Sequence, residues 1–294
     1  MTSSSIVERI TTVASFDFGA GETPENIVVL TDGTICTTLL TGGTVWRSTT
    51  GAEHVAGPGA GAMAVGIASD ADDRLYVAVR SEDANVAGIW RCDATGRWAR
   101  FAAAGIRTGL NGITFDEAGT LFAADSVNGE ILFLPPGDDT LRPWLDDDRM
   151  KPTSPHDPVS STGVNGLKVW DDGLYVTNTA QATVLRVDIQ DGRPGRVTEV
   201  HANIPVDDLA FDAAGTLYLA VHPENTVRRI APDGTTTVLA TADDGLDGPT
   251  AIAVVEDGLL VTNLGMLGTR HTPSLLRLTM EVGAPALPRP ALPL

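Results

Sequence analysis

The sequence predicts an all-β protein, a six-bladed β-propeller with four-stranded blades. Three observations lead to this fold class: one phrase recurs six times, each copy carries a turn residue at a matching place, and no stretch has a helical period. A four-stranded unit repeated every ~40–50 residues is typical of propellers.

The recurring phrase is a short apolar run, an acidic or glycine turn, and a second apolar run. Two apolar runs joined by such a turn predict a β-hairpin. The six copies occupy residues 27–35, 67–75, 113–121, 167–174, 209–217 and 252–259. A third strand is expected after each copy, at residues 44–47, 88–91, 130–133, 183–186, 225–228 and 274–277.

A fourth strand is expected after five of the copies, for example at residues 196–200 and 235–239. The sixth copy is followed by a Pro-rich tail, residues 284–294, and proline cannot donate to a sheet ladder. Because residues 9–13 resemble 235–239, we expect the N-terminal segment, residues 1–18, to complete the last blade. This closure pairs the open edge of the last blade's third strand and closes the ring, and residues 1–294 then form one propeller domain.

Composition restricts the classes of partner. The chain has 294 residues, 43% hydrophobic and 20% charged, as in soluble globular proteins. A formal charge of −18 argues against nucleic acid or an anionic membrane, so a small molecule is the expected partner. Cys36 and Cys92 fall in apolar runs and predict no disulfide framework. With neither a signal-peptide pattern at the start nor an apolar stretch of ~20 residues, we expect a cytoplasmic protein.

One register of the predicted inner strands is rich in side-chain oxygens. The first strand of each propeller blade lines the central channel, so residues at one register form a ring around the axis. Counting back eight residues from the turn residues 33, 73, 119, 173, 215 and 258 gives Glu25, Val65, Asn111, Asn165, Asp207 and Thr250. The preceding register is apolar, and the following one consists mostly of residues with little or no side chain.

This register has the chemistry of a cation site. Carboxylate and amide oxygens are the ligands of hard divalent cations, and two converging carboxylates repel each other without one. The predicted metal ligands are Glu25, Asn111, Asn165 and Asp207. An all-oxygen set favours Ca²⁺, with Mg²⁺, Mn²⁺ and Zn²⁺ as alternatives. Turn chemistry is the competing interpretation, because Asn-Gly is also a common hairpin dipeptide.

Residues 163–177 and 206–218 carry a resemblance to a known family. Over residues 24–278 the chain resembles the gluconolactonase/regucalcin family (the senescence-marker-protein type) and, more distantly, paraoxonases and diisopropylfluorophosphatase. The resemblance implies a metal on a Glu of the first blade, an Asn of the third and fourth, and an Asp of the fifth. Those motif positions are Glu25, Asn111, Asn165 and Asp207, the residues that the register had selected.

The chain also departs from this family. Gluconolactonases often carry an Arg for sugar hydroxyls on the second blade, and residues 65–67 offer none. The first-blade motif around Glu25 also lacks the usual aromatic residue shortly after it. Residues 206–208 and 221–223 are similar to a paraoxonase stretch, which points to an apolar lactone or ester rather than a sugar lactone.

The resemblance implies a metal-dependent hydrolase of a lactone or related ester. The metal would polarise the substrate carbonyl, and a nearby base would take a proton from water. The candidates for that base are Asp207, Asp208 and His222. Asp125 and Asn178 could line the same mouth or cap turns. His156 lies in a Pro-rich loop, residues 146–162, that could cover a channel mouth.

Other classes of function stay open. One is a metal-dependent phosphotriesterase, or a biosynthetic enzyme that opens or isomerises a lactone. Another is a non-catalytic interaction propeller with a structural channel metal, because propellers host many functions. The substrate and the oligomeric state cannot be read from the sequence.

Overall fold

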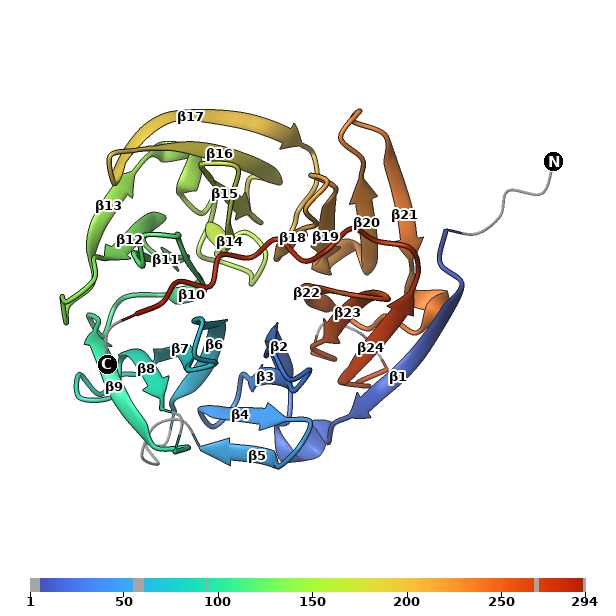
Figure 1. Ribbon diagram of the computed structural model, residues 1–294, viewed down its shortest axis with the longest axis horizontal. Helices are drawn as coiled ribbons and strands as arrows, with labels where there is room; N and C mark the ends of the chain where they lie inside the picture. The colour runs from blue at the N-terminus through green and yellow to red at the C-terminus, as the bar shows by residue number, and fades with distance from the viewer. Residues whose placement is uncertain (1–5, 55–60, 94, 267–269, 293–294) are drawn as a thin grey trace.

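The computed structural model describes residues 6–54, 61–93, 95–266 and 270–292, and shows a six-bladed β-propeller (Figure 1). Each blade is a four-stranded antiparallel sheet, as the repeats predict. Residues 1–5 of the predicted N-terminal segment and residues 293–294 of the Pro-rich tail lie outside the described residues. Within the described ranges, no helix is long and apolar enough to cross a membrane.

The inner strand of each blade lies next to the channel and the second strand pairs with it. The inner strands are β2 (Pro24–Val29), β6 (Met63–Ser69), β10 (Leu110–Phe115), β14 (Val164–Trp170), β18 (Leu209–Phe211) and β22 (Pro249–Val255). The second strands are β3 (Ile35–Leu39), β7 (Leu75–Arg80), β11 (Leu121–Asp125), β15 (Gly173–Asn178), β19 (Leu217–Val221) and β23 (Gly258–Asn263).

The third and outer strands complete the blades, and nearly all contain the predicted segments. The third strands are β4 (Thr44–Arg47), β8 (Gly88–Cys92), β12 (Glu130–Leu134), β16 (Thr183–Gln190), β20 (Thr226–Ile230) and β24 (Ser274–Thr279). The outer strands are β5 (Gly51–His54), β9 (Trp98–Ala103), β13 (Arg142–Asp146), β17 (Arg193–Ala202), β21 (Thr236–Ala240) and β1 (Arg9–Ser15).

The first and last strands of the chain close the ring. β1 pairs antiparallel with β24, from Arg9 opposite Thr279 to Ser15 opposite Ser274, so the N-terminal strand completes blade six as predicted. The other described residues form loops and four 3-10 turns: η1 (Phe18–Ala20), η2 (Asp148–Met150), η3 (His222–Glu224) and η4 (Ala242–Asp244).

The apolar core is divided among the interfaces between blades. Each pair of neighbouring blades shares one cluster of buried side chains; Tyr76 of blade two, for example, packs edge-on against Phe115 of blade three. This burial holds the six inner strands in fixed positions around the axis, because apolar area removed from water stabilises by about 25 cal/mol per Å². Polar side chains near the axis are therefore held on a rigid frame.

The hairpin turns between inner and second strands face one end of the channel, and the starts of the inner strands face the other. At the turn end, Asp73 takes the place of glycine and adopts the left-handed conformation (φ 59°), which Asp tolerates better than most residues. Residues 284–292 of the Pro-rich tail form no strand and cross the turn end of the propeller over several blades (Figure 1).

Candidate functional site

The predicted ligands all lie near the start of an inner strand. Glu25, Asn111 and Asn165 are the second residues of β2, β10 and β14, and Asp207 precedes β18 by two residues. Asp207 still belongs to the sheet, because its backbone N–H donates to the carbonyl of Ala220 in β19 (2.8 Å). We call these four residues the oxygen ring and the mouth beside them the ring end.

Irregular strand pairing re-aims the ring residues. The register of the inner strand against the second strand shifts between Pro24 and Ile27, between Leu110 and Ile113, and between Val164 and Leu167. Such bulges turn side chains out of the regular alternation and occur often beside active sites. Each shift brackets a ring residue, so the ring is a local departure from regular strand geometry.

The layer of small residues after the ring lets the inner strands approach one another closely. A Cβ added to Gly112 would lie 2.6 Å from the carbonyl oxygen of Asn165, and one added to Gly166 would lie 2.4 Å from Oδ1 of Asp208. Neither space admits a side chain. Glycine is therefore required here for close backbone approach, which explains the small-residue register seen in the sequence.

The two amides of the ring are held in one orientation. Asn111 Nδ2 donates to Ser126 Oγ (3.0 Å), and Asn165 Nδ2 donates to Thr179 Oγ1 (3.0 Å). Ser126 and Thr179 in turn donate to the backbone carbonyls of the next blade, at 2.6 and 2.8 Å. Within the described part of the chain neither amide oxygen accepts a hydrogen bond, so both oxygens stay available as ligands.

Of the two carboxylates of the ring, Glu25 is buried and Asp207 is mostly buried, and their charges repel each other. Burial raises the pKa of Glu25 to about 7; the Asp208 charge adds to this and the Arg80 guanidinium opposes it. The pKa of Asp207 lies well above its usual value, first because of burial and then because of Glu25 and Asp208. The hydrogen bond from Asn165 Nδ2 (2.8 Å) offsets part of that effect. A cation between the carboxylates would favour their charged forms.

Arg80 is a site residue that the sequence analysis missed. It ends β7 in blade two, and its Nε donates to the carbonyl of Leu110. Burial lowers the pKa of Arg80, whereas the charges of Glu25, Asp125 and Asp207 raise it, so the guanidinium lies within electrostatic reach of the ring. Blade two thus supplies an Arg from the end of its second strand. Asp125 and Asn178 end the second strands of the next two blades, as Arg80 does in blade two. This shared position was the signal from which the sequence could have predicted Arg80 near the channel mouth.

His222, a predicted base, lies beside the ring. It opens η3, and its Nδ1 is 3.9 Å from Oδ2 of Asp207. That nitrogen is buried without a hydrogen-bond partner among the described residues. Burial lowers the pKa of His222 to about 4, although a hydrogen bond with the Gly248 backbone and the charge of Asp247 act in the opposite direction. The imidazole of His222 is therefore neutral at neutral pH.

Asp208, another predicted base, is engaged elsewhere. Lys168 Nζ donates to both of its carboxylate oxygens (2.9 Å each), and the backbone N–H of Leu209 donates to Oδ1 (2.8 Å). Asn26 Nδ2 adds a longer contact to Oδ2 (3.4 Å). The Asp208–Lys168 pair is almost completely buried, and it lies on the channel side of the ring toward the hairpin turns.

The remaining candidates hold loops. Asp125 accepts hydrogen bonds from the backbones of Gly109 (2.9 Å) and Asn128 (3.0 Å), and Asn178 Nδ2 donates to the carbonyls of Arg149 and Lys151. These contacts are turn and loop capping. His156 is exposed in the loop that Asn178 anchors.

The oxygen ring fits a hard cation. Its metal-ligating atoms would be the oxygens of two carboxylates and two amides, which are the ligands that Ca²⁺ takes most readily. Among the described residues no three His, Cys, Asp or Glu side chains gather into a metal-binding group, so the amides of Asn111 and Asn165 are essential to any site here. The assignment of the four ligands stays a prediction.

No family model and no curated protein matches the chain. Solved structures do: a calcium-binding regucalcin from Agrobacterium tumefaciens is 18% identical, covers 91% of this chain and 94% of its own, and superposes with a TM-score of 0.67. A gluconolactonase from Xanthomonas campestris is also 18% identical; the match covers 92% of this chain and 89% of the gluconolactonase, with a TM-score of 0.67. Virginiamycin B lyase from Staphylococcus aureus is 14% identical; the match covers 93% of this chain and 99% of the lyase, with a TM-score of 0.65. At these identities the similarity shows the fold.

Proposed function

We propose that this protein is a metal-dependent hydrolase that acts on an apolar lactone or related ester. The observation that carries the proposal is the oxygen ring: two mostly buried carboxylates with raised pKa values next to two amide oxygens that accept no hydrogen bond within the described residues. Regucalcin and gluconolactonase propellers among the structural neighbours support the same reading.

Glu25, Asn111, Asn165 and Asp207 would hold the metal. A bound divalent cation would supply Lewis acidity toward the substrate carbonyl. Ser126 and Thr179 accept hydrogen bonds from the amide groups of Asn111 and Asn165, and these bonds would orient the two amide oxygens toward a bound metal. Arg80 places a buried positive charge beside it, where an N–H group can donate to an oxygen of the substrate.

His222 and Asp207 are the better candidates for the base. His222 is neutral at neutral pH because its pKa is lowered to about 4. Its Nδ1 makes no hydrogen bond among the described residues and lies 3.9 Å from Oδ2 of Asp207. A water between them could pass its proton to either group. Asp208 is less suited, because its two oxygens accept four hydrogen bonds from three donor groups.

The rim of the ring end favours an apolar substrate. Ile106, Val127 and Met266 lie in loops that precede β10, connect β11 to β12 and follow β23, all at the end where the inner strands begin. These side chains are exposed by 53, 55 and 46%. These side chains would offer apolar contact to a substrate that enters at this end.

Hydrolysis of a substrate panel tests the proposal. The panel contains aliphatic lactones, a sugar lactone, an aryl ester and a phosphotriester, assayed after chelator treatment and after Ca²⁺ is restored. We expect turnover of an aliphatic lactone that chelator abolishes and Ca²⁺ restores. Thermal unfolding with and without Ca²⁺ reports cation binding independently of activity. A protein that Ca²⁺ stabilises but that turns over no member of the panel would contradict the enzymatic proposal and favour a binding propeller.

A further inference from the structure

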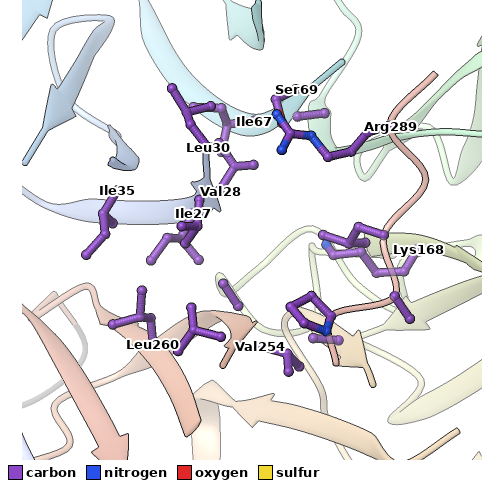
Figure 2. A pocket seen from close by; sticks show the side chains of 18 of the residues that line it. Ile27, Val28, Leu30, Ile35, Ile67, Ser69, Lys168, Val254, Leu260 and Arg289 are labelled. Carbon is purple, nitrogen blue, oxygen red and sulfur yellow. The ribbon is translucent and has the colours of Figure 1, made fainter. Parts of the chain in front are cut away.

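A large cavity lies at the other mouth of the channel, where the hairpin turns are. Its volume is about 770 Å³, and it opens between the ends of the inner strands and the C-terminal segment, residues 281–292 (Figure 2). Small-molecule sites in proteins measure about 300–1,000 Å³. The proposed hydrolase site does not use this cavity, which we call the turn-end cavity.

All six blades contribute one layer to its wall. The layer lies three residues beyond the oxygen ring along each inner strand and consists of Val28, Ala68, Thr114, Lys168, Ala210 and Ala253. Lys168 is the one charged member. Ile27, Ile67 and Phe211 add further apolar surface. Charged side chains line the cavity elsewhere: Glu256, Asp257, Arg277 and Arg289, of which Arg277 pairs with Asp257.

The C-terminal segment forms a fixed part of the wall. Near its start, the N–H of Ala213 in blade five donates to the carbonyl of Ala284 (2.8 Å). Near its end, the N–H of Ala71 in blade two donates to the carbonyl of Pro290 (3.0 Å), and Arg74 donates to the carbonyl of Leu292 (2.7 Å). The segment is therefore tied down on both sides of the mouth.

Polar groups gather on one side of the cavity. Figure 2 shows Lys168, Arg289 and Ser69 on the side of the C-terminal segment, and Ile35 and Leu260 across from them. Arg289 bonds through Nη2 to the carbonyl of Asp70 (3.0 Å) and to Asp73. The cavity thus has a polar side and an apolar side.

Donors on the polar side are not all used. Ser69 Oγ and Arg289 Nε are buried without a hydrogen-bond partner among the described residues. Lys168 Nζ gives two of its three N–H groups to Asp208, which leaves one. Buried donors without acceptors cost free energy, and an acceptor brought by a ligand would recover it after a small shift of the Ser69 and Arg289 side chains.

We propose that the turn-end cavity binds a small molecule with an apolar body and one carboxylate, at a site separate from the oxygen ring. The carboxylate lies on the side of Lys168, Arg289 and Ser69, and the apolar body packs against Ile35, Val254 and Leu260. Such a ligand matches unused donors with acceptor oxygens and removes apolar surface from water. This goes beyond the proposed hydrolase and does not depend on it.

Calorimetric titration of chelator-treated protein with three eight-carbon probes tests the head group. The probes are octanoate, 1-octanol and octylammonium, which have eight carbons each and differ in the head group and its charge. We expect octanoate to bind at least about tenfold more tightly than the other two. Equal binding of all three, or no binding of octanoate, would overturn the proposal.

Two variants locate the site. Ala253→Phe fills the cavity from β22, and we expect it to weaken octanoate binding by at least about tenfold, whereas Ala99→Phe on the exposed face of β9 leaves it unchanged. Arg289→Gln leaves all blades intact and should reduce the preference of octanoate over octanol. If both variants bind octanoate as the unaltered protein does, the site lies elsewhere.

Asp207→Ala separates this site from the oxygen ring. We expect it to bind octanoate with unchanged affinity, because Asp207 does not line the cavity. Loss of octanoate binding in Asp207→Ala would place the probe at the ring and overturn the second site. Absence of lactone hydrolysis in the unaltered protein would leave the titration result intact.

Discussion

The two ends of the channel are built from the same six strands and differ in chemistry. At the ring end three inner strands are irregular and carry Glu25, Asn111 and Asn165, and Asp207 lies just before the inner strand of blade five. Three residues further on, the layer is uncharged except for Lys168. The buried Asp208–Lys168 pair links the two regions, since Asp208 follows Asp207 and Lys168 lines the cavity. The same six strands thus carry the polar oxygen ring at one end of the channel and the more apolar turn-end cavity at the other.

The largest expected effect is on activity at the ring end. Asp207→Ala or Asn165→Ala removes a ligand oxygen, so we expect lactone hydrolysis to fall by on the order of 100-fold or more, with Ca²⁺ no longer raising the melting temperature. Circular dichroism should report an unchanged β-rich fold. Asp32→Ala, which removes an exposed turn carboxylate, is the control. Turnover at the level of the unaltered protein in both ring variants contradicts the ligand assignment.

A second effect concerns the Asp208–Lys168 pair, which lies between the oxygen ring and the turn-end cavity. Lys168→Met leaves the Asp208 carboxylate buried without its cation, which should lower the free energy of unfolding by about 3–5 kcal/mol in urea titration. Lys151→Met, which removes a partly exposed pair with Asp146, should cost less than about 1 kcal/mol. Similar losses in the two variants would mean that Asp208 does not depend on Lys168.

The third effect is a pH dependence that belongs to the ring end alone. In chelator, unfolded Glu25 loses its proton near pH 4.5 and folded Glu25 near pH 7, so Glu25 lowers the free energy of unfolding as pH rises through that interval. Glu25→Gln does not titrate and should be more stable than the unaltered protein at pH 7.5, by on the order of 1–3 kcal/mol. Urea titrations at pH 4.5 and 7.5 measure the difference. An equal pH slope in both proteins would show that Glu25 has an ordinary pKa.

The smallest effect is on the orientation of an amide. Thr179→Val keeps the shape of the side chain but removes the acceptor of the Asn165 amide group, so Ca²⁺ affinity should fall by about tenfold. Thr38→Val removes a similarly buried hydroxyl that bonds to the carbonyl of Val65 and touches no ring amide. Calorimetric titration with Ca²⁺ compares the two. If Thr38→Val weakens binding as much, the effect comes from the frame and not from Asn165.

Much of the fold follows from local sequence. Hairpin signals depend on residues a few positions apart and recur six times, so the strands, their order and the closure by β1 were predictable, and the structure agrees. The positions of Glu25, Asn111, Asn165 and Asp207 follow from the same repeat. Their role as metal ligands stays a prediction.

Tertiary structure alone decided the contacts between blades. The Asp208–Lys168 pair joins residues 40 positions apart, and Asn26 reaches Asp208 across 182 positions. No local pattern encodes such pairs, because they depend on how neighbouring blades pack. For the same reason the sequence did not reveal Arg80 beside the ring, the commitment of Asp208 to Lys168, or the Pro-rich tail as the wall of a cavity. The sequence by itself determined the strands and which residues repeat around the axis, and packing of the closed ring decided which of them meet.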